Sequence, residues 1–401
     1  MNILYLGYWN LKDPLTEATI FPNLEILENF EFISKIIFCN TERELKHPVF
    51  EPGFKHTKIE YCPIFSGPPT LGIITKIVDF IRFPKQLARV AQREHIDIVV
   101  ARGAVAGSLA YFLWKTTQIP FVVESFEPHA DYMEESGVWY KHGIQYFFQR
   151  KWEAAQKKHA KGLIPVAQNY RRKLLEEGVL DNRIRIAPCY INFQKFYFDE
   201  AKIKSLRKER GISESTTVGI YAGKYGGLYL EEECFELYAG AFRCFSDFQL
   251  IILTPTQFHA WVFSQVARHK LPVDRILVKS VTYEEVPEYL MMSDFAYATY
   301  KSGYSKAYLS PVKIGEYWAC GLPVILTRGV GDESEFITNK AGVLFDPESI
   351  NVEKTDDIYR SLSNYLHTSQ IRRDISLLAR NYRNKSRTID AYKFFVSPQT
   401  D

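Results

Sequence analysis

The sequence is poor in cysteine, and its cysteines are not spaced to bind a metal. Six of them are spread over 401 residues without a Cys-x-x-Cys pair. They are Cys39, Cys62, Cys189, Cys234, Cys244 and Cys320. This spacing indicates neither a zinc site nor a disulfide framework, so we expect reduced thiols and no metal site.

Long hydrophobic runs are also missing. No apolar stretch approaches the roughly 18 residues that a membrane-spanning helix needs. The first residues, 1–7, lack the basic start and the long apolar segment of a signal peptide. We therefore expect a cytoplasmic protein, or one that is attached to the inner face of a membrane.

Neither sign of charge is in large excess. The chain has 50 basic and 47 acidic side chains and a formal net charge of +3, which is too balanced to indicate nucleic acid as a partner. With 46% hydrophobic and 24% charged residues, the composition is typical of a globular protein. A chain of this length predicts two domains of about 150 to 200 residues each.

Short apolar runs alternate with helical patterns along the whole chain. We expect strands at 3–7, 33–38, 96–100, 119–123, 162–166, 184–188, 217–222, 250–253, 276–279, 294–297 and 324–326. We expect helices at 73–93, 103–114, 145–161, 169–178, 231–242, 284–290 and 381–395. This alternation with short turns predicts an α/β fold with doubly wound parallel sheets.

Polar side chains follow the expected strand at 119–123. Ligands of open α/β sheets bind beyond the carboxyl ends of the strands, so Glu124 and His129 are candidate site residues. A single histidine in a loop is more often solvated or hydrogen-bonded for structural reasons. The residues alone leave both interpretations open.

A glycine-rich turn follows the expected strand at 217–222. Gly223, Gly226 and Gly227 would let the backbone approach a phosphate closely, while Lys224 would supply a positive charge. A turn of this kind is a weak signal by itself. It gains weight from a second potential anion site further along the chain.

That second site is the segment 308–326. Ser310 is expected to cap a helix that ends at Gly321, and Lys313 and Glu316 would lie on one face of it. The amino end of such a helix offers free N–H groups and a positive dipole end to an anion such as pyrophosphate. Glu316 could then accept hydrogen bonds from sugar hydroxyls. Any αβ unit can contain a capped helix before an apolar strand, so this ordinary interpretation also stays open.

The same segment resembles a known signature. It contains the pattern S-P-x-K-x-x-E-Y-x-A-x-G-x-P-V, which is similar to the donor-binding signature of retaining GT-B glycosyltransferases, in particular the large family-four group. The matching residues are Ser310, Pro311, Lys313, Glu316, Tyr317, Ala319, Gly321, Pro323 and Val324.

The resemblance implies a GT-B fold, in which two Rossmann-like domains face each other across a cleft. The acceptor-side domain would span residues 1–195, and the nucleotide-sugar-binding domain would span residues 196–380. Residues 381–401 would form a helix that crosses back to the first domain.

The resemblance also implies roles for individual residues. His129 is the first candidate for a contact to the sugar or its developing charge, Glu124 is the second, and Glu316 completes the catalytic candidates. Tyr308 stands where many relatives carry a second glutamate. The implied donor-binding residues are Gly223, Lys224, Gly226, Gly227, Ser280, Val281, Tyr308, Leu309, Ser310, Lys313 and Glu316.

The implied reaction transfers a glycosyl group from a UDP- or GDP-sugar to an acceptor hydroxyl, with retention and without a metal or other cofactor. A helix dipole and cations would stabilise the leaving diphosphate. The acceptor would be a carbohydrate or a lipid-linked saccharide in polysaccharide or glycoconjugate synthesis. The alternatives are a GT-B epimerase or phosphorylase and a catalytically silent sugar-nucleotide-binding protein.

The stretch 73–93 bears on a contact with membranes. Basic residues alternate there with apolar and aromatic ones, and such a helix could rest on anionic lipid if the acceptor is lipid-linked. A pattern of this kind is more often a solvated helix face.

Overall fold

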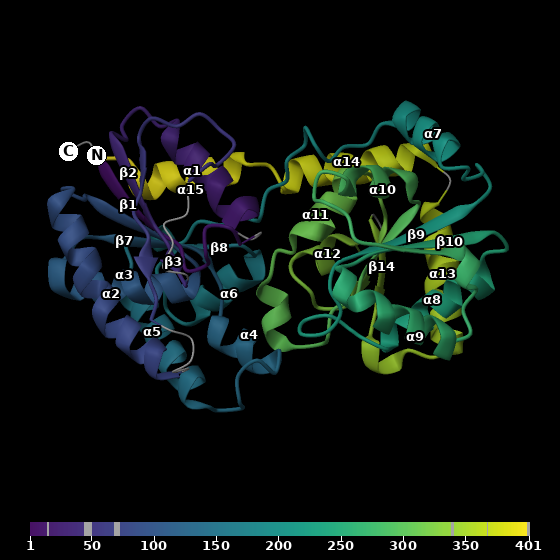
Figure 1. The fold of residues 1–401 in the computed structure, drawn as a ribbon, viewed down its shortest axis with the longest axis horizontal. Helices are drawn as coiled ribbons and strands as arrows, with labels where there is room; N and C mark the ends of the chain where they lie inside the picture. Colours follow the sequence, from purple (N-terminus) through teal and green to yellow (C-terminus); the bar gives the residue numbers. More distant parts are fainter. Residues whose placement is uncertain (14–15, 44–49, 68–72, 338–340, 367, 399–401) are drawn as a thin grey trace. The chain divides into compact units, whose positions relative to one another are not determined.

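The chain folds into two units in the computed structural model (Figure 1). The structure describes residues 1–13, 16–43, 50–67, 73–337, 341–366 and 368–398, without the side chains of residues 73, 74, 76 and 77. Unit 1 comprises Met1–Pro188 and Ser386–Asp401, and unit 2 comprises Cys189–Lys385. The division therefore falls at residues 188 and 385, whereas the predicted division fell at residues 195 and 380.

Unit 1 is built on a six-stranded parallel sheet. Its strands are buried along most of their length, as expected for a parallel sheet that is covered on both faces. In spatial order they are β4 (Ile59–Tyr61), β2 (Lys35–Cys39), β1 (Asn2–Leu6), β6 (Ile98–Arg102), β7 (Phe121–Phe126) and β8 (Gly162–Pro165). A separate pair consists of β3 (Thr41–Glu42) and β5 (Ile64–Phe65).

Helices cover this sheet on both sides. α3 (Gly103–Thr117) packs on β6 and β7 and contacts α2 (Ile73–Arg93) and α5 (Ile144–His159), while α1 (Phe21–Glu28) packs against α15 (Ser386–Val396) (Figure 1). The remaining helical segments are the π-helix η1 (Thr16–Ile20), α4 (His129–Glu135), α6 (Gln168–Glu176) and the 3-10 turn η3 (Asp181–Arg183).

Unit 2 repeats this architecture with a second six-stranded parallel sheet. In spatial order its strands are β11 (Ile276–Lys279), β10 (Phe248–Leu253), β9 (Thr217–Ala222), β12 (Phe295–Ala298), β13 (Val324–Thr327) and β14 (Gly342–Phe345). Numbered along the chain, the strands of both sheets run 3-2-1-4-5-6, the doubly wound Rossmann order. The strand order therefore reverses between β1 and β6 in unit 1 and between β9 and β12 in unit 2, and such positions are where ligands bind.

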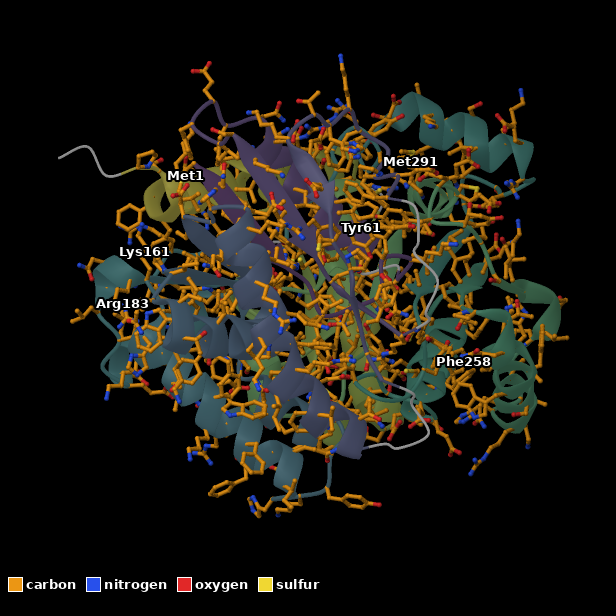
Figure 2. All side chains as sticks on the ribbon, turned by 60° about the vertical axis from the view of Figure 1, so that its left-hand side comes forward. Met1, Tyr61, Lys161, Arg183, Phe258 and Met291 are labelled. Carbon is orange, nitrogen blue, oxygen red and sulfur yellow. The ribbon has the colours of Figure 1, made fainter. Side chains whose placement is uncertain are left out.

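Two apolar cores lie on the two faces of the second sheet. The first contains Met291 and the second is contacted by Phe258, both labelled in Figure 2. The first face is covered by α7 (Glu200–Glu209), α10 (Val286–Met292), α11 (Val312–Ala319) and α14 (Ser369–Tyr382). The second face is covered by α8 (Glu233–Cys244), α9 (His259–Arg268) and α13 (Val352–Leu362). The other short elements are α12 (Glu333–Ile337), η4 (Thr256–Phe258), η5 (Val273–Arg275), η6 (Tyr304–Tyr308), η7 (Pro347–Ser349) and η8 (Ser363–Tyr365).

The predicted α/β fold with two doubly wound parallel sheets is confirmed, but two predicted elements are wrong. Residues 184–188 make only an isolated bridge between Leu163 and Ile184, because the ladder next reaches Pro165, which has no N–H to donate. The helix predicted at 381–395 is two helices, since α14 ends at Tyr382 and α15 begins at Ser386.

The last helix is fixed to unit 1 by a hydrogen bond and by close packing. The Tyr392 hydroxyl donates to Oε2 of the buried Glu124 in β7. At the start of β8, a Cβ on Gly162 would lie 2.5 Å from the Phe395 ring. A glycine is required there because the ring of α15 occupies the space of a side chain.

Replacing Tyr392 with phenylalanine should therefore destabilise the protein. The change leaves a buried carboxylate oxygen without its hydroxyl donor, so we expect a loss of about 1–3 kcal/mol in the free energy of unfolding. Urea denaturation of Tyr392→Phe and of Tyr140→Phe, whose side chain is 88% exposed, measures the difference. Equal stabilities of the two variants would contradict this role of Tyr392.

Candidate functional site

The glycine-rich turn lies at the carboxyl end of β9, where the strand order of unit 2 reverses. Gly226 and Gly227 have φ values of +77° and +62°, which glycine adopts more readily than any other residue. The Tyr221 hydroxyl donates to the carbonyl of Lys224, and the Lys224 side chain is exposed. The turn is thus held from the strand side while its lysine faces solvent.

The next candidate element is α11, which begins at Val312. Pro311 occupies the N-cap position, and no side chain caps the helix. The predicted cap by Ser310 is wrong, because its hydroxyl oxygen accepts hydrogen bonds from the Cys189 N–H and the Arg383 guanidinium. The predicted end of the helix is confirmed, since Gly321 follows it with a φ of +74°.

A buried polar cluster fixes the start of α11 from behind. The fully buried Arg383 donates to Ser310, to Glu333 and to the carbonyls of Cys189 and Pro311. Burial raises the pKa of Glu333 to about 7, while the neighbouring Arg383 acts in the opposite direction. We conclude that Ser310 serves to anchor the helix, and its side chain is already bonded to protein.

Tyr317 fastens α11 to the end of β9. Its hydroxyl accepts from the Ala222 N–H at 3.1 Å and lies 3.2 Å from the Ala222 carbonyl, to which it donates. Ala222 directly precedes the glycine-rich turn. This contact holds α11 beside the start of the glycine-rich turn.

Lys313 reaches across this junction. Its Nζ lies 2.6 Å from the position of a Cβ on Gly223, so a side chain there would displace the lysine, and the φ of +153° at Gly223 also favours glycine. The ammonium lies 3.9 Å from the ring centroid of Tyr229, 5.2 Å from that of Tyr221 and 5.7 Å from that of Tyr300. It is buried and has no hydrogen-bond partner among the described residues.

This environment suits a cation that binds an anionic ligand. The tyrosine ring faces attract the ammonium electrostatically, yet they leave its three N–H donors unused. A phosphate can therefore bind Lys313 without first breaking an ion pair. Lys313 was predicted to bind the donor, but its contact with the glycine-rich turn was not predicted from the sequence.

Glu316 lies one turn further along α11 and is buried. The Tyr283 hydroxyl donates to its Oε1 at 2.7 Å. Burial raises the pKa of Glu316, while the Tyr283 hydrogen bond and the nearby charges of Lys313, Lys195 and Arg383 lower it. The carboxylate thus faces a hydroxyl group in the structure.

Tyr283 was missed by the sequence analysis. It follows β11 in the same loop as Ser280, which is exposed, and Val281, which is half-buried. The Nζ of Lys195 lies 3.7 Å from the ring centroid of Tyr283. The sequence contains no pattern that pairs Tyr283 with Glu316, because the two residues are 33 positions apart.

Tyr308 and Leu309 immediately precede the cluster around Ser310. The Tyr308 ring is buried and packs edge-on against Tyr304, with centroids 5.1 Å apart. The carbonyl of Leu309 lies 2.8 Å from the position of a Cβ on Gly331. The Tyr308 side chain is therefore part of the protein's packing.

Glu124 in unit 1 is a buried carboxylate with several protein donors. It is 2% exposed and accepts hydrogen bonds from Tyr5, Asn23, Arg102 and Tyr392. These donors come from β1, α1, β6 and α15, so Glu124 connects the N-terminal part of the chain to its last helix. Its arrangement is that of a structural residue, and we do not assign it a catalytic role.

His129 is the first residue of α4. Its ring stacks near Tyr132 at 6.4 Å and meets Trp139 edge-on at 5.6 Å, and its side chain is 21% exposed. Beneath it, the buried Glu153 accepts hydrogen bonds from the Ala130 N–H at 3.0 Å and from Gln149 at 3.1 Å. Glu153 thus holds the start of the helix that carries His129.

Among the described residues, no group of three or more His, Cys, Asp or Glu side chains is placed to hold a metal ion. None of the helices in the part of the chain that the structure covers is both long and apolar enough to cross a membrane.

The stability of wild-type protein should depend on pH through Glu153. Burial raises its pKa from 4.5 to about 7, so the folded carboxyl keeps its proton to a higher pH than the unfolded one. The stability that this proton contributes is complete at low pH and is lost as the pH rises through this window. We therefore compare the free energy of unfolding of Glu153→Gln with that of wild type. Relative to wild type, the value for the variant should rise by at most about 3 kcal/mol from about pH 5 to about pH 8.

Urea denaturation at both pH values measures this gain. Glu25→Gln, which changes an exposed glutamate of α1, serves as the matched control and should follow the wild-type pH dependence. A constant difference between Glu153→Gln and wild type would contradict the raised pKa.

Comparisons with known proteins agree with this architecture. Residues 42–195 match the model of Glycosyltransferase Family 4. The search of curated proteins found no match. The structure is similar to sucrose-phosphate synthase from Thermosynechococcus elongatus, with a TM-score of 0.70, 15% identity and coverage of 98% of this chain and 96% of the other.

Two further solved structures have the same fold. HepE of Anabaena in complex with UDP gives a TM-score of 0.69 at 14% identity over 97% of each chain. WaaG, a glycosyltransferase involved in lipopolysaccharide biosynthesis, gives a TM-score of 0.65 at 14% identity over 98% of this chain and 100% of the other. The chain therefore has the GT-B fold, and it is similar to family-four glycosyltransferases over residues 42–195.

Proposed function

We propose that the protein transfers a glycosyl group from a UDP-sugar to an acceptor hydroxyl and that unit 2 binds the donor. The observation that carries this proposal is the buried Lys313 ammonium, which lies against Gly223 without a hydrogen-bond acceptor among the described residues. A UDP-sugar is favoured over a GDP-sugar because HepE, which has the same fold, binds UDP and UDP-glucose.

In this proposal the diphosphate binds at the junction of β9 and α11. Lys313 donates to its oxygens, backbone groups of the turn 223–227 approach it closely, and Lys224 adds a second positive charge from the solvent side. The amino end of α11 contributes its dipole. Such fixed charges stabilise the negative charge that develops on the leaving diphosphate, without a metal or other cofactor.

The nucleoside lies along the neighbouring loops. Glu316 accepts a hydrogen bond from a ribose hydroxyl in place of the one from Tyr283, and the backbone of Ser280 and Val281 contacts the base. Leu309 and the backbone of Tyr308 line the sugar side of the donor. The exchange at Glu316 replaces one hydroxyl donor with another, so the buried carboxylate keeps a partner.

His129 of unit 1 is proposed to contact the transferred sugar or its developing charge. The reaction is proposed to retain the anomeric configuration, with a donor phosphate oxygen as the base for the acceptor hydroxyl. The acceptor is proposed to be a carbohydrate or a lipid-linked saccharide in the synthesis of a surface polysaccharide or glycoconjugate. A lipid-linked acceptor would bring the protein to the inner face of a membrane.

Two other activities are compatible with the same donor site. An epimerase or phosphorylase would convert the donor without a saccharide acceptor, whereas a catalytically silent protein would bind the donor without turning it over. Product analysis of UDP-sugar incubations with and without acceptor saccharides separates these activities from transfer.

Lys313→Met should weaken the binding of UDP but not that of uridine. The substitution keeps the length and apolar character of the side chain and removes the charge that contacts the diphosphate. We expect a loss of about 1–3 kcal/mol in the free energy of UDP binding, measured by isothermal titration calorimetry with both ligands.

Lys354→Met provides the matched control, because Lys354 is exposed on α13. This variant should bind both ligands as wild type does. The proposal would be wrong if Lys313→Met bound UDP with unchanged affinity. An equal loss for uridine and UDP would also contradict it, since uridine has no phosphate.

A further inference from the structure

The first two turns of α5 expose an apolar face to solvent. Ile144, Phe147 and Phe148 are spaced three and four residues apart and are 65%, 71% and 49% exposed. The opposite face carries Gln149 and Glu153, which are buried in unit 1. The helix therefore has polar groups inside and large apolar groups outside, the reverse of an ordinary surface helix.

Neighbouring segments carry further exposed apolar residues. Val138 and Tyr140, just before α5, are 60% and 88% exposed. α2 lies beside α5 (Figure 1), and the ring of Phe80 stacks on that of Trp152 at a centroid distance of 4.6 Å. We use the name α2–α5 patch for the exposed apolar residues of these segments, which are Val78, Ile81, Val138, Tyr140, Ile144, Phe147 and Phe148.

The charges around the α2–α5 patch are mostly basic. Within residues 78–85 and 135–151, which contain the patch, the exposed lysine, arginine and acidic side chains are Arg82, Lys85, Lys141, Arg150 and Lys151, against Glu135. Asp79, which pairs with Arg82 at 3.1 Å, is itself buried. An apolar surface with aromatic rings and a basic border has the properties of a protein face that rests on anionic lipid.

We propose that the α2–α5 patch docks on the surface of an anionic bilayer. Phe147, Phe148 and Ile144 enter the boundary between the lipid headgroups and the acyl chains, and the lysines and arginines bind lipid phosphates. This surface lies on unit 1 and does not depend on the donor site of unit 2.

A second copy of the chain fits the patch less well than lipid does. A twofold interface brings the same patch of both copies together. The basic side chains at its border would then face one another, and juxtaposed like charges are unfavourable. An anionic membrane satisfies both the apolar centre and the basic border.

Vesicle flotation with the full chain tests this proposal. We expect wild-type protein to float with vesicles of phosphatidylcholine and phosphatidylglycerol but not with phosphatidylcholine alone. The double variant Phe147→Ser/Phe148→Ser should lose binding by at least about tenfold, because two inserted side chains are removed. Lys141→Glu/Lys151→Glu should lose binding to a similar extent, and high salt should weaken wild-type binding.

The matched control is Phe263→Ser/Leu277→Ser, which changes two apolar side chains of unit 2 that are each 44% exposed. It should bind the vesicles as wild type does. All variants should bind UDP with wild-type affinity, which separates a failure of this proposal from a failure of the donor site.

Three outcomes would overturn the proposal. The first is the absence of vesicle binding by wild type, and the second is equal binding to both kinds of vesicle. The third is wild-type binding by Phe147→Ser/Phe148→Ser. A wild-type dimer that this variant dissociates, without any vesicle binding, would instead assign the patch to an interface between copies.

Discussion

The contact between the Lys313 ammonium and Gly223 is the constraint on which the rest of the donor site depends. A desolvated ammonium over ring faces gains about 2 kcal/mol or more, and it keeps its hydrogen-bond donors for a ligand. Had a carboxylate held Lys313, an incoming diphosphate would have to compete with that ion pair. Glycine at position 223 is part of the same arrangement, because a side chain there would displace the ammonium from its present position.

Several parts of unit 2 hold this contact in place. The strand order brings the ends of β9 and β12 together, and the Tyr317 hydroxyl ties α11 to Ala222. Behind the helix, Arg383 and Glu333 form a fully buried ion pair. Such a pair contributes little net stability because both charges lose their hydration. The pair instead fixes the position of α11, since the same guanidinium binds the residues that precede the helix.

The fold was largely predictable, because alternating apolar runs and helical patterns are local features of the sequence. The bounds predicted for α2 and β9 agree with the structure, and so does the end of α11 at Gly321. Long-range interactions were not predictable. Ser310 has the chemistry of a helix cap, but a guanidinium 73 residues further along the chain binds its hydroxyl. Glu124 looked like a site residue after a strand, yet its hydrogen-bond donors come from distant parts of the chain and make it structural.

The location of the diphosphate can be observed directly in a crystal structure of the protein with bound UDP. The account predicts diphosphate oxygens within hydrogen-bonding distance of the Lys313 ammonium and beside the backbone of the turn 223–227, with a ribose hydroxyl on Glu316. A diphosphate bound elsewhere, with Lys313 still enclosed only by the rings of Tyr221, Tyr229 and Tyr300, would contradict it.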